Sequence, residues 1–432
     1  PSITRSDQIR SSVLMAAEHL SAWPDLPPDL LATVLRRLPS LADRVRLRAV
    51  CRPWRSSASG LPPSHLHLPW LAFLDGTLLD VANNAAHRVR IPDDAVCYSA
   101  GENTLFLAHD DGRCSLVDAF SGATETPLPE LASLLRARNV DPRYELLQPI
   151  TKVVVSTSSA GLEEHCRLVA VMIHNGKVII STCRPAGETN ACLALDDYFE
   201  FCIADIRFFQ GRIYALSKVH EALRALDLKK GRLDELPASP PPGVEVIPGV
   251  APSHKFELAR EPHLHEDPWP YGHVVARRYL VESNGNLLMV RRWVRKSLMN
   301  FSYYSMTEFH DDDGYGIDRT RRFEVFEIGY DEWKFRPRWQ KVQCLHGQAL
   351  FVSSSCSKAA HAADHGAQQD CIYFTHQFVP RKPDDTLGDS GVYSMRDGTI
   401  TRPLLPDPAA LPGSLPWCRR FPSWVFPTEG AV

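Results

Sequence analysis

The sequence predicts an α+β multidomain chain in which a small N-terminal module of three short helices precedes an all-β propeller of about six or seven blades. Two patterns lead to this prediction. Apolar residues recur with helical spacing in one early segment, 23–58, and short apolar strands preceded by a polar residue and glycine recur from residue 66 onward. Helical spacing and tight turns between apolar strands are the main sequence signals for these two kinds of element.

The composition of the 432-residue chain is that of a globular protein, with 44% hydrophobic and 23% charged residues. Its net charge of −3 provides no global field that would attract nucleic acid or an anionic membrane, so we expect neither as a partner. Proline is enriched, with 34 residues. Many short elements joined by rigid turns are therefore expected.

The cysteines and the absence of a long apolar run indicate the cellular compartment of the protein. Eleven cysteines are scattered without any Cys-x-x-Cys pair, and no apolar run approaches the length of a membrane span. We therefore expect reduced thiols and a location in the nucleus and/or cytoplasm.

Met15 resembles a natural start, so residues 1–14 are interpreted as an upstream extension, and residues 1–21 are expected to form a disordered tail.

Residues 22–62 form the predicted helical module. Its lead-in, 23–28, is proline-rich, and a residue before proline is driven out of the α region. A first helix is predicted over 29–38, because its apolar residues recur with helical spacing: Leu30, Leu31, Val34, Leu35 and Leu38. Pro39 ends this helix.

Two further helices complete the module. Ser40 and Asp43 have the spacing of a helix start, and an apolar stripe follows them. A third short helix contains Val50, Cys51 and Trp54. Pro53 is tolerated there only if the helix begins nearby, since a proline in the first turn loses no hydrogen bond.

So small a module cannot bury all of its apolar surface internally. Either a partner protein covers it, or it packs as a cap on the rest of the chain. Seven arginines in the same segment steer the module toward an acidic partner, or toward phosphates, or form a solvated face; the positions are 36, 37, 44, 46, 48, 52 and 55.

The apolar and proline pattern of this module resembles the F-box, the motif that docks on a Skp-type adaptor of cullin-based ubiquitin ligases. The resemblance covers nearly the whole motif in the right order. It implies that one set of residues contacts the adaptor or forms the core beneath that contact: Leu26, Pro27, Leu30, Leu31, Val34, Leu35, Leu38, Val50, Cys51 and Trp54.

Residues 66–430 are predicted to form the propeller. A polar residue followed by glycine precedes an apolar strand at seven places: 75–76, 111–112, 175–176, 210–211, 284–285, 346–347 and 397–398. Glycine supplies the positive φ that tight antiparallel turns require, so these places are predicted to be hairpin turns. Many hairpins in series favour a propeller, because a ring of sheets protects the strand edges that would otherwise aggregate. Two tandem β-sandwiches are the alternative. Long loops are expected at Leu236–Gly272, His310–Gly314 and Ser353–Asp370.

Both ends of this region resemble the plant F-box proteins that carry a KIB-type β-propeller. The resemblance rests on residues 69–73, 115–122, 371–375, 388–393 and 422–427. In a closed ring of this kind, Leu71–Phe73 and Trp424–Phe426 are expected to pair and seal the propeller.

No phosphate-binding glycine loop, nucleophile elbow or zinc-protease motif is present. The nearest metal-like groupings are His361 with Asp364 and His365, and the segment 263–267; both are interpreted as solvated loop residues. We therefore expect no catalytic residue, no metal and no cofactor.

The predicted function is that of a non-catalytic substrate receptor in a ubiquitin ligase. The F-box would bind a Skp-type adaptor and through it a cullin, while the propeller would bind a target protein through residues that the sequence does not identify. A scaffold without a role in ubiquitination is one alternative, and a propeller enzyme is the other.

Overall fold

The computed structural model describes the chain as two compact units, one containing the N-terminal helices and one containing the propeller strands. The described residues are 26–37, 47, 50–59, 68–82, 85–89, 91–120, 126–137, 150–156, 167–173, 177–183, 192–194, 203–218, 221–227, 244–247, 272–296, 319–330, 337–377, 387–402, 404 and 422–426. The predicted tail, 1–21, lies outside them. Among the described residues, none of the helices has the length and apolar character needed to cross a bilayer.

The helical unit contains α2 (Pro28–Arg37) and α4 (Arg52–Ser59). The first hydrogen bonds of helix α2 run from the amides of Leu30 and Leu31 to the carbonyl of Pro27. Pro53 lies in the first turn of α4, and the Arg55 amide donates to the carbonyl of Cys51, the residue before the helix. The expectation that the helix starts near Pro53 is therefore confirmed. Most of the predicted middle helix lies outside the described residues.

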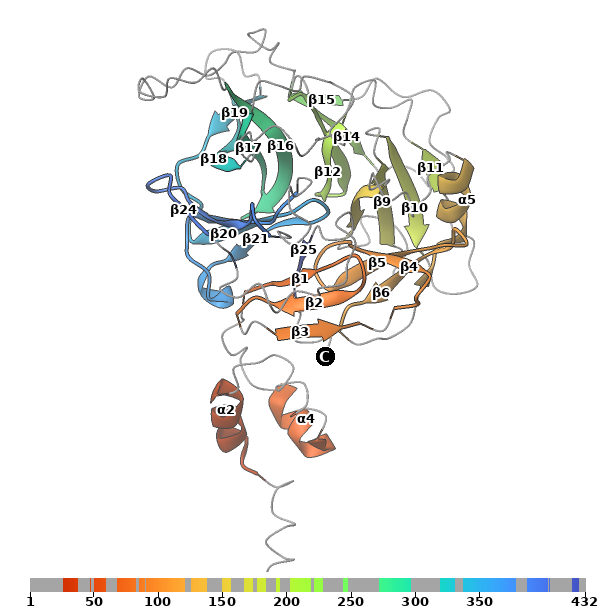
Figure 1. Ribbon diagram of the computed structural model, residues 1–432, viewed down its shortest axis with the longest axis vertical. Coiled ribbons are helices and arrows are strands. Elements are labelled where there is room, and N and C mark those ends of the chain that lie inside the picture. The colour runs from red at the N-terminus through yellow and green to blue at the C-terminus, as the bar shows by residue number, and fades with distance from the viewer. Residues whose placement is uncertain are drawn as a thin grey trace, which may run out of the picture. The chain divides into compact units, whose positions relative to one another are not determined.

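The propeller consists of six sheets arranged in a ring (Figure 1). Blade 1 contains β1 (Trp70–Ala72), β2 (Thr77–Asp80), β3 (Ala85–Arg88) and β25 (Ser423–Val425). Blade 2 contains β4 (Ala95–Ser99), β5 (Thr104–His109), β6 (Cys114–Asp118) and β7 (Thr126–Pro127). Blade 3 contains β8 (Ile150–Val155), β9 (Arg167–Ile173), β10 (Val178–Cys183) and β11 (Cys192–Ala194).

The ring continues through three further sheets. Blade 4 contains β12 (Ile203–Phe209), β13 (Arg212–Ser217), β14 (Leu223–Asp227) and β15 (Val244–Ile247). Blade 5 contains β16 (Gly272–Ser283), β17 (Asn286–Lys296), β18 (Thr320–Tyr330) and β19 (Pro337–Lys341). Blade 6 contains β20 (Gln348–Val352), β21 (Ser357–His361), β22 (Cys371–Phe374), β23 (Gly391–Ser394) and β24 (Ile400–Thr401).

The ring closes as the sequence predicted. Strand β25 pairs antiparallel with β1, and Leu71 lies opposite Trp424. The last strand of the chain therefore completes the first blade. The fold is a six-bladed propeller, and the alternative of two tandem β-sandwiches is wrong.

The predicted glycine turns are confirmed at six places. Gly76, Gly112, Gly211, Gly285, Gly347 and Gly398 all have positive φ. Gly285, with φ of +75°, lies in the turn between β16 and β17 of blade 5, so the turn fixes their register. The seventh turn, 175–176, lies outside the described residues.

Two of the three expected long loops require correction. The proline-rich stretch Leu236–Gly272 contains strand β15, which pairs with β14. The segment Ser353–Asp370 contains β21, which pairs along its full length with β20. It also contains the short 3-10 helix η2 (Ala363–His365). Short strands bordered by prolines and serines lack the long apolar alternation on which prediction depends. The predicted loop His310–Gly314 lies outside the described residues.

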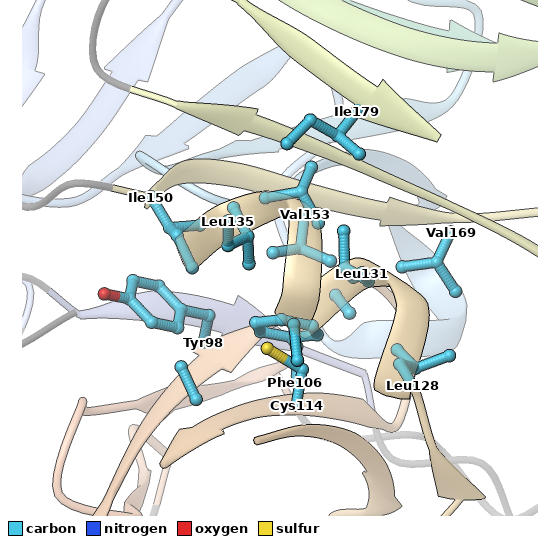
Figure 2. Packing of buried hydrophobic residues seen from close by; sticks show 14 of the residues in the cluster. Tyr98, Phe106, Cys114, Leu128, Leu131, Leu135, Ile150, Val153, Val169 and Ile179 are labelled. Carbon is cyan, nitrogen blue, oxygen red and sulfur yellow. The ribbon is translucent and has the colours of Figure 1, made fainter. Parts of the chain in front are cut away.

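A helix that the sequence analysis did not predict, α5 (Pro129–Ala137), helps to build the hydrophobic core. Leu131 and Leu135 of this helix are buried in one cluster with Phe106 of blade 2 and Val153 of blade 3 (Figure 2). Apolar strands that are buried on both faces, as here, form the packed interfaces between neighbouring blades.

Candidate functional site

The predicted adaptor-binding residues divide into a core and an exposed group. Leu31 is fully buried and forms a small cluster with Leu47, against which the half-buried Leu26 and Trp54 pack. Cys51 is also half-buried, and Pro27 is exposed. Leu38 lies outside the described residues, as does the side chain of Leu35, although Leu35 itself is part of α2.

The exposed group consists of three aliphatic side chains. Leu30 is 53% exposed, Val34 is 40% exposed and Val50 is 63% exposed. Leu30 and Val34 are four residues apart on α2, so they lie on the same side of the helix. Within the described part of the chain, no other large hydrophobic side chain is this exposed. Exposed apolar side chains that gather in one small unit are typical of a surface that a partner covers.

The propeller contains one arrangement that superficially suggests catalysis. His109 lies between Ser115 and Asp94: its Nε2 is 3.4 Å from the Ser115 Oγ, and its Nδ1 is 3.6 Å from the Asp94 Oδ2. Both His109 and Ser115 are only 1% exposed. A hydroxyl buried in this way has no access to a substrate, so the arrangement does not support nucleophilic catalysis.

The buried cysteines are also poor nucleophiles. Burial, with a smaller contribution from Asp75, raises the pKa of Cys97 to about 12. Burial likewise raises the pKa of Cys356 and of Cys371. These groups are therefore thiols rather than reactive thiolates at neutral pH.

The metal-like groupings of the sequence are only partly described. His361 lies in β21, while Asp364 and His365 lie in η2. Within the described ranges, no group of three or more histidine, cysteine or carboxylate side chains comes together as a metal site. The second grouping, 263–267, lies outside those ranges.

Buried charges connect neighbouring blades, and the sequence analysis did not identify them. Lys152 of β8 forms an ion pair with Asp205 of β12 at 2.5 Å, and both side chains are almost completely buried. Asp205 also accepts the amide of Leu280 of β16 at 2.7 Å. This carboxylate therefore joins blades 3, 4 and 5.

A second buried pair joins blades 5 and 6. Arg292 of β17 donates to the Asp389 Oδ2 at 2.9 Å, and neither side chain has any exposed surface. Burial alone lowers the pKa of Arg292, but Tyr279 and Asp389 outweigh that effect and raise it. The guanidinium thus stays charged. Arg402 donates to the other oxygen of Asp389, also at 2.9 Å.

Glu221 is held between two arginines at the boundary of blades 4 and 5. Arg278 and Arg291 both donate to its carboxylate, with Nε distances of 2.6 and 2.8 Å. Burial raises the pKa of Glu221, but the hydrogen bonds and charges of the two arginines outweigh it and hold the pKa below its ordinary value. A run of arginines within a buried strand, such as Arg291 and Arg292 in β17, is the sequence signal for such pairs.

Both the propeller and the helical module match models of known protein families. A family model described as the KIB1-4 beta-propeller matches residues 78–394, and an F-box-like model matches residues 23–61. An F-box protein of Arabidopsis thaliana is 22% identical over 399 residues, which cover 88% of this chain and 93% of the relative.

Two further relatives agree with these matches. A second Arabidopsis thaliana F-box protein is 21% identical over 368 residues, which cover 82% of this chain and 95% of the relative. A third, also an F-box protein of Arabidopsis thaliana, is 44% identical over 43 residues, or 10% of each chain. The first two relatives therefore match most of the chain, and the third matches a short segment.

Proposed function

This chain belongs to the KIB1-4 β-propeller family and carries an F-box-like module, and from that premise we propose that it is the substrate-recognition subunit of a Skp-cullin-F-box ubiquitin ligase. An F-box combined with a β-propeller suggests a substrate adaptor. In the proposed complex, the module at 22–62 binds a Skp-type adaptor and through it a cullin, and the propeller at 66–430 binds a target protein for ubiquitination.

The observation that carries this proposal is the exposure of Leu30, Val34 and Val50 in the helical unit. Burying a valine or leucine side chain is worth about 1.5–3 kcal/mol, so an adaptor that covers these three residues gains substantial binding energy. Leu31 and Trp54 hold the helices beneath them. These residues are thus proposed to support the docking surface rather than to form it.

The proposed receptor needs no catalytic residue of its own. It holds the target close to the ubiquitin-transfer machinery of other subunits, which converts an encounter in solution into a nearly intramolecular reaction. The buried Ser115 and the raised thiol pKa values are consistent with a binding role for the propeller.

We further propose that the protein acts in the nucleus and/or cytoplasm. Six of the described cysteines are free thiols: Cys51, Cys97, Cys114, Cys344, Cys356 and Cys371. Free thiols of this number fit a reducing compartment.

Co-purification tests the proposal. The intact chain, and a chain lacking residues 22–60, are each isolated with a Skp-type adaptor, and the bound proteins are identified by mass spectrometry. Adaptor and cullin should accompany only the intact chain, and proteins retained by both chains are candidate targets. Absence of the adaptor from both chains contradicts the proposal.

The lifetime of a captured target separates the receptor from a scaffold. If the chain is a ligase receptor, depleting it should lengthen the lifetime of the target. An unchanged lifetime, with adaptor binding intact, would indicate a scaffold without a role in ubiquitination.

A further inference from the structure

Two arginines face each other across the first hairpin of blade 5. Arg277 of β16 is the register partner of Arg292 of β17, so their side chains lie on the same face of the sheet. Tyr279, two residues after Arg277, lies on that face as well, and its hydroxyl accepts Arg292 at 3.4 Å. Like charges directly opposite each other in a sheet are destabilising. This pair therefore requires a compensating negative charge.

Arg292 has a counter-charge, whereas Arg277 does not. Arg292 donates to the Asp389 Oδ2 at 2.9 Å. Within the described residues no carboxylate forms an ion pair with Arg277, and its Nε is buried without a hydrogen-bond partner. Burial lowers the pKa of Arg277, and Arg292 lowers it further; Tyr279 and Asp205 oppose this shift without cancelling it. A guanidinium nevertheless stays charged at neutral pH, and a buried charge requires a partner.

Asp389 is not available to Arg277, because its hydrogen-bonding capacity is already used. Its Oδ2 accepts Arg292 and the Thr320 hydroxyl, at 2.9 and 2.7 Å. Its Oδ1 accepts the Thr320 amide and Arg402, both at 2.9 Å. A carboxylate offers about four acceptor sites, and all four are occupied here.

Asp205 is likewise committed to other groups. Its Oδ1 forms the ion pair with Lys152 at 2.5 Å and accepts the amide of Ile206 at 2.8 Å. Its Oδ2 accepts the amide of Leu280 at 2.7 Å. The charge of Arg277 is therefore balanced by neither buried carboxylate of this region.

A second unpartnered donor belongs to Gln377, which lies between β22 and β23 of blade 6. The Tyr279 hydroxyl accepts Arg292, so its single hydrogen is donated to the Gln377 Oε1 at 2.8 Å. This leaves the amide nitrogen of Gln377 as a donor, and that nitrogen is buried without a partner. Gln377 is only 5% exposed. Buried amide donors in folded proteins are nearly always paired, so this one indicates a bound acceptor.

We propose that Arg277 and Gln377 hold a monatomic anion of the chloride type between blades 5 and 6. One unpartnered donor is charged and the other is neutral, so both fit a ligand that carries negative charge and only accepts hydrogen bonds. Water would accept from Gln377 but would not balance the charge of Arg277. The anion would stabilise the ring by relieving the repulsion between Arg277 and Arg292.

Burial favours a small ligand and leaves it a route to solvent. Tyr279 is 3% exposed and Gln377 is 5% exposed, so a bulky anion would have to displace the side chains that cover them. Arg277 is half-buried, and its side is the one from which a small ion can exchange. Because the unfolded chain has no such site, stability should increase with the concentration of the anion.

The test is thermal unfolding of the intact chain in sodium chloride, with sodium gluconate added to hold the ionic strength constant. Gluconate is too large to occupy the site. The unfolding midpoint of the propeller should rise by about 2 °C or more for each tenfold increase in chloride above the dissociation constant. Equal midpoints in chloride and in gluconate would overturn the proposal.

Two variants remove the need for chloride in different ways. Arg277→Gln removes the unbalanced charge, so the midpoint should not depend on chloride and, in gluconate alone, should equal or exceed that of the wild type. Gln377→Glu provides a carboxylate within the chain, to which Tyr279 can still donate. Its midpoint should be independent of chloride and close to that of the chloride-saturated wild type.

Arg207→Gln is the matched control. Arg207 lies on β12 of the neighbouring blade and its side chain is 20% exposed, but it donates to the Ser357 carbonyl at 2.8 Å. Its replacement should lower the midpoint and leave the chloride dependence of the wild type unchanged. Loss of that dependence in Arg207→Gln would indicate a general salt effect and contradict the assigned site.

A crystal of the intact chain soaked in bromide locates the ion. One anomalous peak is expected within hydrogen-bonding distance of the Gln377 Nε2 and the Arg277 guanidinium. Density without an anomalous signal at that place would indicate water and overturn the proposal. A bromide peak combined with a midpoint that does not respond to chloride would indicate an adventitious ion only, which also overturns it.

Discussion

Leu71 of β1 lies directly opposite Trp424 of β25, so strands from the two ends of the propeller sequence form one sheet. Trp424 is fully buried, and its ring centre lies 5.3 Å from that of Phe351 in blade 6. Ser99 of blade 2 donates to the Trp424 carbonyl at 2.8 Å. One residue thus connects the closing blade to both of its neighbours.

Replacing Trp424 should weaken the whole ring. Trp424→Ala removes a large buried side chain, and we expect it to lower the free energy of unfolding by about 3–5 kcal/mol. Deleting residues 423–432 removes the closing strand and should abolish cooperative unfolding of the propeller. Chemical denaturation followed by tryptophan fluorescence measures both effects. An unchanged midpoint for the deletion would show that the ring does not depend on this closure.

The buried pair of Arg292 and Asp389 should be strongly coupled. Asp389→Ala leaves Arg292 buried without its counter-charge, and we expect a loss of about 3–5 kcal/mol in the free energy of unfolding. Replacing both residues, as Arg292→Met with Asp389→Leu, removes the two charges together and should recover much of that loss. A double variant as unstable as the sum of Arg292→Met and Asp389→Leu, each measured alone, would show that the pair is not coupled.

Glu221 should make stability depend on pH in the acid range. Its pKa is held below the ordinary value of about 4.3 by Arg291 and Arg278, which outweigh burial. The unfolded chain therefore binds a proton before the folded chain does as the pH falls. The stabilising contribution is complete above about pH 4.3 and is lost as the pH falls through the lower, folded-state pKa.

Glu221→Gln tests this linkage. The variant should be less stable than the wild type at neutral pH, and the difference should shrink as the medium is acidified below about pH 4.3. Thermal unfolding midpoints measured across this range provide the data. A constant difference at every pH would contradict the assigned pKa shift.

Leu30 and Leu31 are adjacent in sequence but should respond differently to substitution. Leu31→Ala removes a fully buried side chain and should cost about 2–5 kcal/mol, enough to unfold so small a helical unit. Leu30→Ala changes a side chain that is 53% exposed and should leave the unit folded. Amide hydrogen exchange of residues 22–62 in the intact chain measures whether the helical unit stays folded in each variant. Far-ultraviolet circular dichroism is unsuitable because the signal of the propeller dominates the spectrum.

The sequence alone predicted the parts of the fold that local patterns determine. Glycine at positions such as Gly285 marked the turns, and apolar residues near both ends marked the strands that close the ring. Strand β15 was missed because prolines surround it. Helix α5 was missed because it follows directly on an apparent strand, although Leu131 and Leu135 have helical spacing.

The charged sites could not be predicted because they depend on contacts between blades. Arg292 and Asp389 are 97 residues apart, and an arginine in a strand is ordinarily exposed. Which arginine of a pair faces a neighbouring blade depends on strand register, which only the folded ring establishes. The adaptor-binding set was proposed from resemblance, and the structure separates its buried residue Leu31 from its exposed residues Leu30, Val34 and Val50.

The most direct test of the receptor role is the affinity of a Skp-type adaptor for a chain carrying Leu30→Asp and Val34→Asp. These substitutions place charge on the exposed apolar side of α2 without changing its buried side. Thr33→Ala, an exposed substitution on the same helix, is the control. The account predicts that adaptor binding is lost in the double variant and kept in the control, with the propeller folded in both. Wild-type affinity in the double variant would contradict it.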